Sequence, residues 1–156
     1  MQGFIKLITS IVICFLPGLI GSLFTIDSVS TWYTTINKPD FNPPDYVFAP
    51  VWTVLYLLMG ISLFLIWKEG LNNKIVKTAF VIFMIQLVFN ALWSVVFFGL
   101  HSIPGGFTVI LVLWILIFVC ILRFKKISAT ASYLLIPYII WVTYATILNF
   151  FILILN

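Results

Sequence analysis

The stretch from Thr78 to Leu122 reads TAFVIFMIQLVFNALWSVVFFGLHSIPGGFTVILVLWILIFVCIL and contains no Asp, Glu, Lys or Arg. About 20 apolar residues in a helix cross the roughly 30 Å hydrocarbon core of a bilayer, so this stretch is long enough for two crossings. Its middle, Gly99 to Gly106, collects Gly, Pro, Ser and His residues that are typical of a tight turn. The stretch therefore predicts two membrane-spanning helices joined by a short connection.

Three further charge-free segments lie at Leu7–Ile26, Tyr46–Trp67 and Ile127–Asn156. They are continuously apolar rather than alternating at every second residue, which favours helices over the strands of a membrane barrel. The first is longer than the apolar part of a signal peptide and no A-x-A-like cleavage site follows it, so we interpret it as a retained helix. The sequence predicts an all-α integral membrane protein, a bundle of five transmembrane helices in one domain over residues 1–156. The expected helices cover about residues 5–25, 46–67, 77–99, 105–123 and 130–155.

The composition agrees with this class and excludes others. Hydrophobic residues make up 63% of the 156 residues and charged residues only 8%, whereas soluble domains average about 45–50% and about 25%. A water-soluble enzyme and an intrinsically disordered chain are both excluded. The net charge of +4 is too scattered to form a nucleic-acid-binding patch, so we expect no nucleic acid partner. Cys14 and Cys120 lie inside apolar runs and are interpreted as packing residues.

The positive charges predict the orientation in the membrane. With five spans, the amino terminus and every second connection lie on the same side of the membrane. The basic residues on that side are Lys6, Lys68, Lys74, Lys77, Arg123, Lys125 and Lys126. The other side has only Lys38, with Asp27, Asp40 and Asp45. Because Lys and Arg are enriched in cytoplasmic connections, we expect a cytoplasmic amino terminus and an external carboxyl terminus in a bacterial plasma membrane.

The connection from Asp27 to Asp45 is long and rich in aromatic and proline residues. Long connections without structure of their own are usually functional or disordered, and prolines favour a folded segment. We therefore interpret residues 27–45 as a lid over the bundle and use that name below. The alternative is an interfacial belt of aromatic residues at the level of the lipid headgroups.

Polar and aromatic residues recur at helical spacing inside three spans. They are Phe48, Trp52 and Tyr56 in the second, Gln86, Asn90, Trp93 and Phe97 in the third, and Pro137, Tyr138, Trp141, Ala145 and Asn149 in the fifth. Each amide alone could be an interhelical hydrogen-bonding group, which membrane bundles commonly use. Taken together, three helices each present a Trp beside a polar or small residue, which favours an aromatic cavity.

Conventional catalytic groups are scarce in this sequence. None of the four acidic residues falls inside a predicted span, and the single His, His101, lies in a short turn without a carboxylate nearby in sequence. We therefore expect no metal site and no acid–base or hydrolytic chemistry. An ion-coupled transporter would also need an intramembrane carboxylate or an internal repeat.

Three motifs carry a resemblance to a known family. They are WY at 32–33 with KPDFNPPDYVFAPVWTVLY at 38–56, QLVFNALW at 86–93 with FFG at 97–99, and PYIIW at 137–141 with ATILN at 145–149. In this order they resemble the TspO/translocator-protein family, the tryptophan-rich sensory proteins also called peripheral benzodiazepine receptors. The resemblance covers nearly the whole chain.

The resemblance implies a homodimeric five-helix bundle whose cavity binds porphyrin or haem-pathway tetrapyrroles and requires no cofactor. It implies a sensor or receptor in tetrapyrrole or stress regulation. Alternatives are a light- and oxygen-dependent porphyrin-degrading enzyme, with Trp52 and Trp141 as candidate reactive residues, or a tetrapyrrole transporter. The expected ligand-binding residues are Tyr33, Pro43, Pro44, Phe48, Trp52, Tyr56, Asn90, Trp93, Phe97, Tyr138, Trp141 and Ala145.

Two positions depart from the family pattern. Phe41 stands where the family has a Trp after its Lys-Pro-x step, so the ring is kept and the indole N–H is lost. No Lys or Arg follows Tyr144, so the basic residue of a consensus sterol motif is missing and cholesterol is not an expected ligand. Membrane lipid and porphyrin-type molecules are the expected partners.

Overall fold

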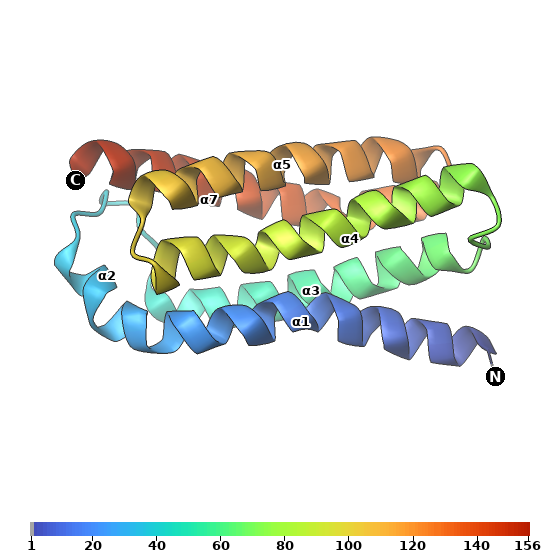
Figure 1. The fold of residues 1–156 in the computed structure, drawn as a ribbon, viewed down its shortest axis with the longest axis horizontal. Helices are drawn as coiled ribbons and strands as arrows, with labels where there is room; N and C mark the ends of the chain where they lie inside the picture. Colours follow the sequence, from blue (N-terminus) through green and yellow to red (C-terminus); the bar gives the residue numbers. More distant parts are fainter. Residues whose placement is uncertain (1) are drawn as a thin grey trace.

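The computed structural model describes residues 2–156, which form a bundle of long antiparallel helices (Figure 1). The helices are α1 (Gln2–Ser30), α2 (Trp32–Thr35), α3 (Asp45–Trp67), α4 (Lys74–Ser94) with the π-helical turn η1 (Val95–Gly99), α5 (Ile103–Lys125), α6 (Ala129–Leu134) and α7 (Ile136–Leu155). Within residues 2–156 five helical segments are long and apolar enough to cross a membrane, with α6 and α7 together forming the fifth. The predicted five-helix membrane bundle is confirmed.

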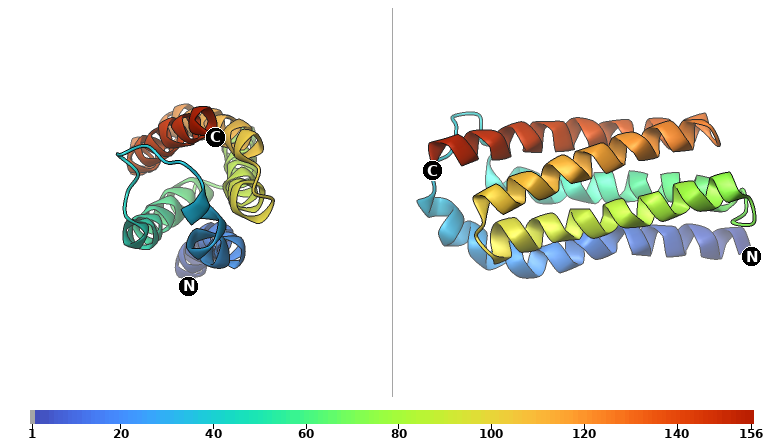
Figure 2. Two further views of the ribbon diagram at one scale, coloured as in Figure 1. Left: turned by 90° about the vertical axis from the view of Figure 1, so that its left-hand side faces the viewer. Right: turned by 45° about the horizontal axis from the view of Figure 1, so that its top comes forward.

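The helices form a closed ring in the order α1, α3, α7, α5, α4 (Figure 2). Helix α1 packs against α3 and α4, while α5 packs against α4 and α7. Contact between α3 and α7 is sparse, because α3 meets the fifth span mainly through α6. The ring order decides which side chains can share one cavity.

The outer surface of the ring is apolar. Large hydrophobic side chains such as Phe4, Leu23, Val88 and Ile140 are each at least 63% exposed on the outside of their helices. In water such a surface would be unstable, whereas lipid tails solvate it without cost. The surface therefore agrees with an integral membrane protein.

Local sequence signals set several helix boundaries. The side chains of Asn73, Ser102 and Ser128 each accept a hydrogen bond from a backbone N–H in the first turn of the helix that follows. Such caps satisfy amide groups that have no partner within the helix. Between η1 and α5, His101 adopts a left-handed backbone conformation with φ of 51°. The turn covers only residues 100–102 and is shorter than the expected 99–106, because Pro104 and Gly105 already lie in the first turn of α5.

Most helix ends lie within about three residues of the expected ones, and two differences matter for the lid and the fifth span. Helix α1 continues to Ser30 instead of ending near residue 25, so residues 27–30 of the lid are helical and its irregular parts are Thr31 and 36–44. The charge of Asp27 ends the apolar span but does not end the helix, since no Gly or Pro follows there. The fifth span divides at Leu135, because Pro137 lacks the N–H that would continue the helix from Tyr133.

Candidate functional site

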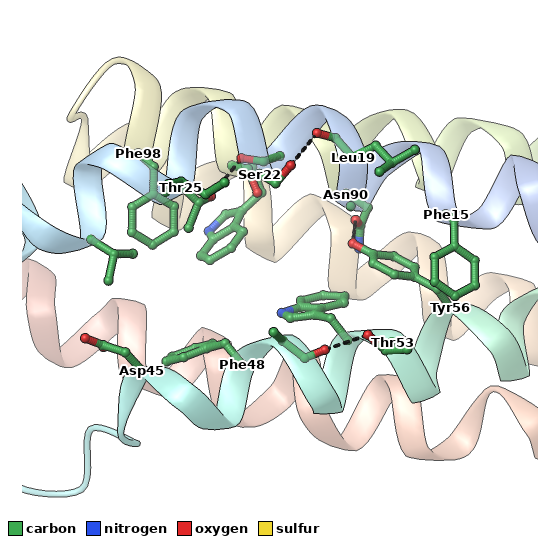
Figure 3. Close-up of a pocket in the computed structure, with 18 of the residues that line it drawn as sticks. Phe15, Leu19, Ser22, Thr25, Asp45, Phe48, Thr53, Tyr56, Asn90 and Phe98 are labelled. Carbon is green, nitrogen blue, oxygen red and sulfur yellow. Dashed lines mark hydrogen bonds between the residues drawn. The ribbon is translucent and has the colours of Figure 1, made fainter.

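A cavity of about 550 Å³ lies between α1, α3 and α4 at the end of the bundle that carries the lid (Figure 3). Its walls are mainly aromatic, formed by Phe15, Phe48, Trp52, Tyr56, Trp93 and Phe98. Side chains of α1 and α3 point toward one another across it. Its volume falls in the range of about 300–1,000 Å³ that is usual for small-molecule sites.

Small residues let α1 form one wall of the cavity. A Cβ atom on Gly18 would lie 2.5 Å from Cε2 of Tyr56, and one on Gly21 would lie 2.8 Å from Oγ of Ser94. These glycines therefore allow α1 to approach α3 and α4 closely. Ser22, one helical turn after Gly18, lines the cavity.

Stacked rings organise the wall formed by α3. The rings of Trp52 and Tyr56 are stacked with centroids 5.3 Å apart, and Phe15 of α1 contacts Tyr56 at 5.7 Å. Aromatic pairs of this kind add about 0.5–1.5 kcal/mol beyond the burial of area. The arrangement presents flat apolar surfaces to the cavity.

A buried hydrogen-bond network closes the cavity on the side away from the lid. The Tyr56 hydroxyl donates to Oδ1 of Asn90 at 2.9 Å, and Nδ2 of Asn90 donates to the Tyr138 hydroxyl at 2.9 Å. The Tyr138 hydroxyl in turn donates to Oε1 of Gln86 at 2.9 Å. Both ends of the Asn90 amide are therefore occupied by protein groups, and the network joins α3, α4 and α7 as interhelical hydrogen bonds do.

The lid is folded and crosses the end of the bundle (Figure 2). Tyr33 is buried and lines the cavity, and its hydroxyl donates to Oδ1 of Asn42 at 2.6 Å. Nζ of Lys38 donates to the backbone oxygens of Tyr33 and Ile36. Burial raises the pKa of Tyr33 above its ordinary value, and the negative charge of Asp45 raises it further. The Tyr33 hydroxyl is therefore a protonated donor at neutral pH.

The lid is also attached to the carboxyl-terminal end of α7. The Tyr144 hydroxyl donates to the backbone oxygen of Phe41 at 2.6 Å, and the Phe41 ring contacts the edge of Phe151. Asn37 and Asn156 exchange hydrogen bonds between side chain and backbone. These contacts hold residues 37–41 against α7 and the end of the chain.

Half of the sequence-predicted ligand-binding residues come together in the cavity. The residues that line it are Tyr33, Phe48, Trp52, Tyr56, Asn90 and Trp93. The residues that do not line it are Pro43, Pro44, Phe97, Tyr138, Trp141 and Ala145. The two prolines precede the first turn of α3, and Tyr138 lies behind the aromatic wall as part of the network.

Phe97 lies outside the cavity because the helix changes its period. The spacing from Trp93 to Phe97 assumed an α-helix, but η1 has the i→i−5 bond of a π-helix from the Leu100 N–H to the oxygen of Val95 at 2.9 Å. The wider turn brings Phe98 to the cavity wall and leaves Phe97 buried behind Trp93. Single π-turns of this kind are frequent at functional sites.

Trp141 and Ala145 lie outside the cavity because α3 stands between α7 and the cavity wall formed by α1. Trp141 lines a second, more open groove of about 750 Å³ between α3 and α7, together with Pro50 and Pro137. Its ring contacts the edge of Phe48, with centroids 6.1 Å apart, so Phe48 separates the groove from the cavity. Ala145 is buried within the bundle.

Sequence reasoning missed the contribution of α1. Phe15, Leu19, Ser22 and Thr25 line the cavity, whereas the expected ligand-binding residues included none from the first span. It also missed Asp45, the acidic residue of the cavity. Within residues 2–156, His, Cys, Asp and Glu form no group of three that could hold a metal ion.

The fold and the cavity define a membrane protein of five spans with an aromatic cavity beneath a folded lid. A family model described as the TspO/MBR family matches residues 10–155. The tryptophan-rich protein TspO of Chlorobaculum tepidum is 44% identical over 92% of this chain and 91% of its own length. The protein of the same name from Archaeoglobus fulgidus is 42% identical over 99% of both chains, and human translocator protein is 32% identical over 84% of this chain and 78% of its own. The chain belongs to the TspO/MBR family.

Proposed function

We propose that this chain is a membrane receptor that binds a porphyrin-type tetrapyrrole in the cavity and acts as a sensor in tetrapyrrole or stress regulation. The observation that carries the proposal is the aromatic cavity of about 550 Å³ formed by α1, α3 and α4. A flat apolar macrocycle gains from stacking against rings such as Trp52 and Tyr56. The printed name of one relative, the tryptophan-rich sensory protein of Cereibacter sphaeroides, supports the sensory role.

The network beneath the cavity favours a receptor over a transporter. Tyr56, Asn90 and Tyr138 are hydrogen-bonded to one another directly below the aromatic walls. Passage of a macrocycle through the bundle would require these buried hydrogen bonds to break, and leaving such groups unpaired costs about 1–3 kcal/mol each. A ligand is therefore held at the end of the bundle that carries the lid.

A second candidate function is light- and oxygen-dependent degradation of the bound porphyrin. It is favoured by the position of Trp52, whose indole lines the cavity and stacks on Tyr56. In this candidate function light absorbed by the porphyrin excites oxygen by energy transfer, and that oxygen adds to the macrocycle and is itself the oxidant, while the Trp52 indole holds the ring by stacking. Trp141 is placed less well for this role, because Phe48 lies between it and the cavity.

We infer that the chain lies in a bacterial plasma membrane with its amino terminus in the cytoplasm and the lid outside. The support is the asymmetry of Lys and Arg between the two sides, with only Lys38 on the side of the lid. We also propose a homodimer, whose mass in light scattering would be twice the 17.8 kDa of one chain.

Titration of protoporphyrin into the purified protein in lipid nanodiscs tests the function. In the dark, saturable quenching of tryptophan fluorescence at one site per chain is expected. Illumination in air then separates the two candidates, since a receptor leaves the porphyrin absorption spectrum unchanged beyond the bleaching seen in empty nanodiscs. Faster bleaching with the protein would support the enzyme, and absence of saturable binding would overturn the receptor and the enzyme together.

A further inference from the structure

Asn149 of α7 is a buried polar residue that lies outside the cavity. Its side chain is 2% exposed and does not line the cavity wall. Nδ2 of Asn149 donates to the backbone oxygen of Ala145 at 2.9 Å, and Oδ1 accepts a hydrogen bond from Nε1 of Trp93 at 3.3 Å. Polar groups inside a membrane bundle are costly unless they are paired, so the partner of Asn149 indicates what this residue does.

The partner, Trp93, belongs to the wall that α4 contributes to the cavity. Its ring stacks on Phe97, with centroids 5.6 Å apart and planes inclined by 15°, and meets Phe98 nearly edge-on. Helices α4 and α7 are not neighbours in the ring of helices, so the bond from Trp93 to Asn149 crosses the interior of the bundle. Helix α7 therefore acts on the cavity wall through a single hydrogen bond.

This hydrogen bond selects one orientation of the indole. Stacking on Phe97 fixes the plane of the Trp93 ring, but the terminal torsion of a Trp side chain is roughly twofold, so a reversed ring could occupy a similar plane. The indole N–H can donate but cannot accept. A reversed ring would leave the N–H and Oδ1 of Asn149 without each other, which is unfavourable for buried groups. Asn149 therefore holds the N–H away from the cavity, and Trp93 offers the ligand an apolar ring without a donor.

We propose that Asn149 is a positioning residue for the cavity, which fixes Trp93 as an apolar stacking surface for a flat aromatic macrocycle. The inference rests on the proposed function, because it assumes that a macrocycle contacts Trp93. The alternative is that Asn149 is only an interhelical hydrogen-bonding group, as is common in membrane bundles. That alternative predicts a loss of stability, but no change of affinity that depends on the indole N–H.

The test is a double-mutant cycle on Asn149 and Trp93, with the dissociation constant for protoporphyrin measured in the dark in lipid nanodiscs. Asn149→Leu removes the acceptor with little change in volume, and Trp93→Phe keeps an aromatic ring but removes the N–H. Such a cycle separates the interaction of two residues from their individual effects. Thr143→Val is the matched control, because it removes the bond from Nε1 of Trp114 to Oγ1 of Thr143 at 2.7 Å, which also joins an indole to α7 but lies outside the cavity.

Asn149→Leu is expected to raise the dissociation constant about tenfold, the scale of one buried hydrogen bond. In the Trp93→Phe background the same substitution should change it by less than about twofold, since no indole N–H remains to be held. Thr143→Val should leave it within about twofold of wild type. Binding is followed by porphyrin absorption, so the different tryptophan content of the variants does not enter the measurement.

The ligand-free protein supplies a second measurement. In NMR spectra of protein with isotope-labelled tryptophan, the indole N–H resonance of Trp93 is identified by its absence in Trp93→Phe. Asn149→Leu should shift this resonance upfield, as the loss of a hydrogen bond does. The resonance of Trp67, at the far end of α3, should stay in place and show that the variant is folded.

Equal losses of affinity in both backgrounds, an unchanged affinity in Asn149→Leu, or an unchanged Trp93 resonance would each overturn the inference. If Asn149→Leu does not fold, Asn149→Ser replaces it under the same criteria, because the Ser hydroxyl can bond to the Ala145 oxygen of its own helix but is too short to reach Trp93. Absence of saturable binding in wild type overturns the proposed function and the inference together. Saturable binding that is insensitive to Asn149 leaves the proposed function standing and removes the inference alone.

Discussion

Replacement of Trp52 by Ala tests whether the ligand occupies the cavity or the groove between α3 and α7. Trp52 lines the cavity and stacks on Tyr56 at 5.3 Å. A large aromatic side chain buries about 150–250 Å²; if about 100 Å² of it faces the ligand, the lost contact is worth about 2.5 kcal/mol at about 25 cal/mol per Å². The dissociation constant for protoporphyrin should therefore rise about 50- to 100-fold. Fluorescence titration in nanodiscs measures this change directly.

Two other tryptophans serve as controls for that measurement. Trp141→Ala alters the groove on the far side of Phe48, and Trp67→Ala alters a half-buried ring that contacts Phe80 at the other end of α3. Both should leave affinity within about threefold of wild type. A loss for Trp141→Ala as large as that for Trp52→Ala, in variants with unchanged thermal stability, would show that the ligand lies between α3 and α7 and would refute the assignment of the cavity.

Three further predictions concern topology, the lid and the network. Single cysteines at positions 30–45 should react with an impermeant reagent added outside intact cells, whereas cysteines at 124–128 should not; labelling of the second set would reverse the orientation. Replacement of 39–44 by Gly and Ser removes the docking contacts of the lid and should accelerate porphyrin release in stopped-flow measurements more than it alters association; unchanged release would favour the aromatic belt. Asn90→Ala breaks two buried hydrogen bonds and should lower the free energy of unfolding by about 1–2 kcal/mol, whereas Thr78→Ala, which affects an exposed hydroxyl bonded to its own helix, should change it little.

The five spans were predictable because absence of charge over a sufficient length is a direct physical requirement of the bilayer. Helix ends were less predictable, because the limits of a span and of a helix are different properties. Asp27 is costly within the hydrocarbon region, yet its backbone continues α1 to Ser30. Pro137 has the opposite effect, since it interrupts the hydrogen bonding of the helix while the apolar segment continues.

The cavity was predictable only where helical periodicity carried the information. Phe48, Trp52 and Tyr56 share one face of α3 and do line the cavity. Trp141 follows an equally regular pattern on α7, but the spacing along one helix does not reveal that α3 stands between α1 and α7 in the ring. Phe97 was expected in the cavity on the assumption of regular α-helical spacing, but the π-helical turn at Val95–Gly99 changes that spacing. The composition of residues 95–99 does not predict such a turn.

Asp45 illustrates how a difference of one residue in a helix boundary changes the interpretation of a site. With a helix expected from residue 46, Asp45 was the last residue of the lid and was not among the expected ligand-binding residues. In the structure Pro44 precedes the first turn and Asp45 begins α3. Asp45, Phe48, Trp52 and Tyr56 then follow at intervals of three, four and four residues, which is one continuous helical face. The carboxylate therefore belongs to the face that carries the aromatic wall, and the position of the helix start decides whether Asp45 is assigned to the cavity or to the lid.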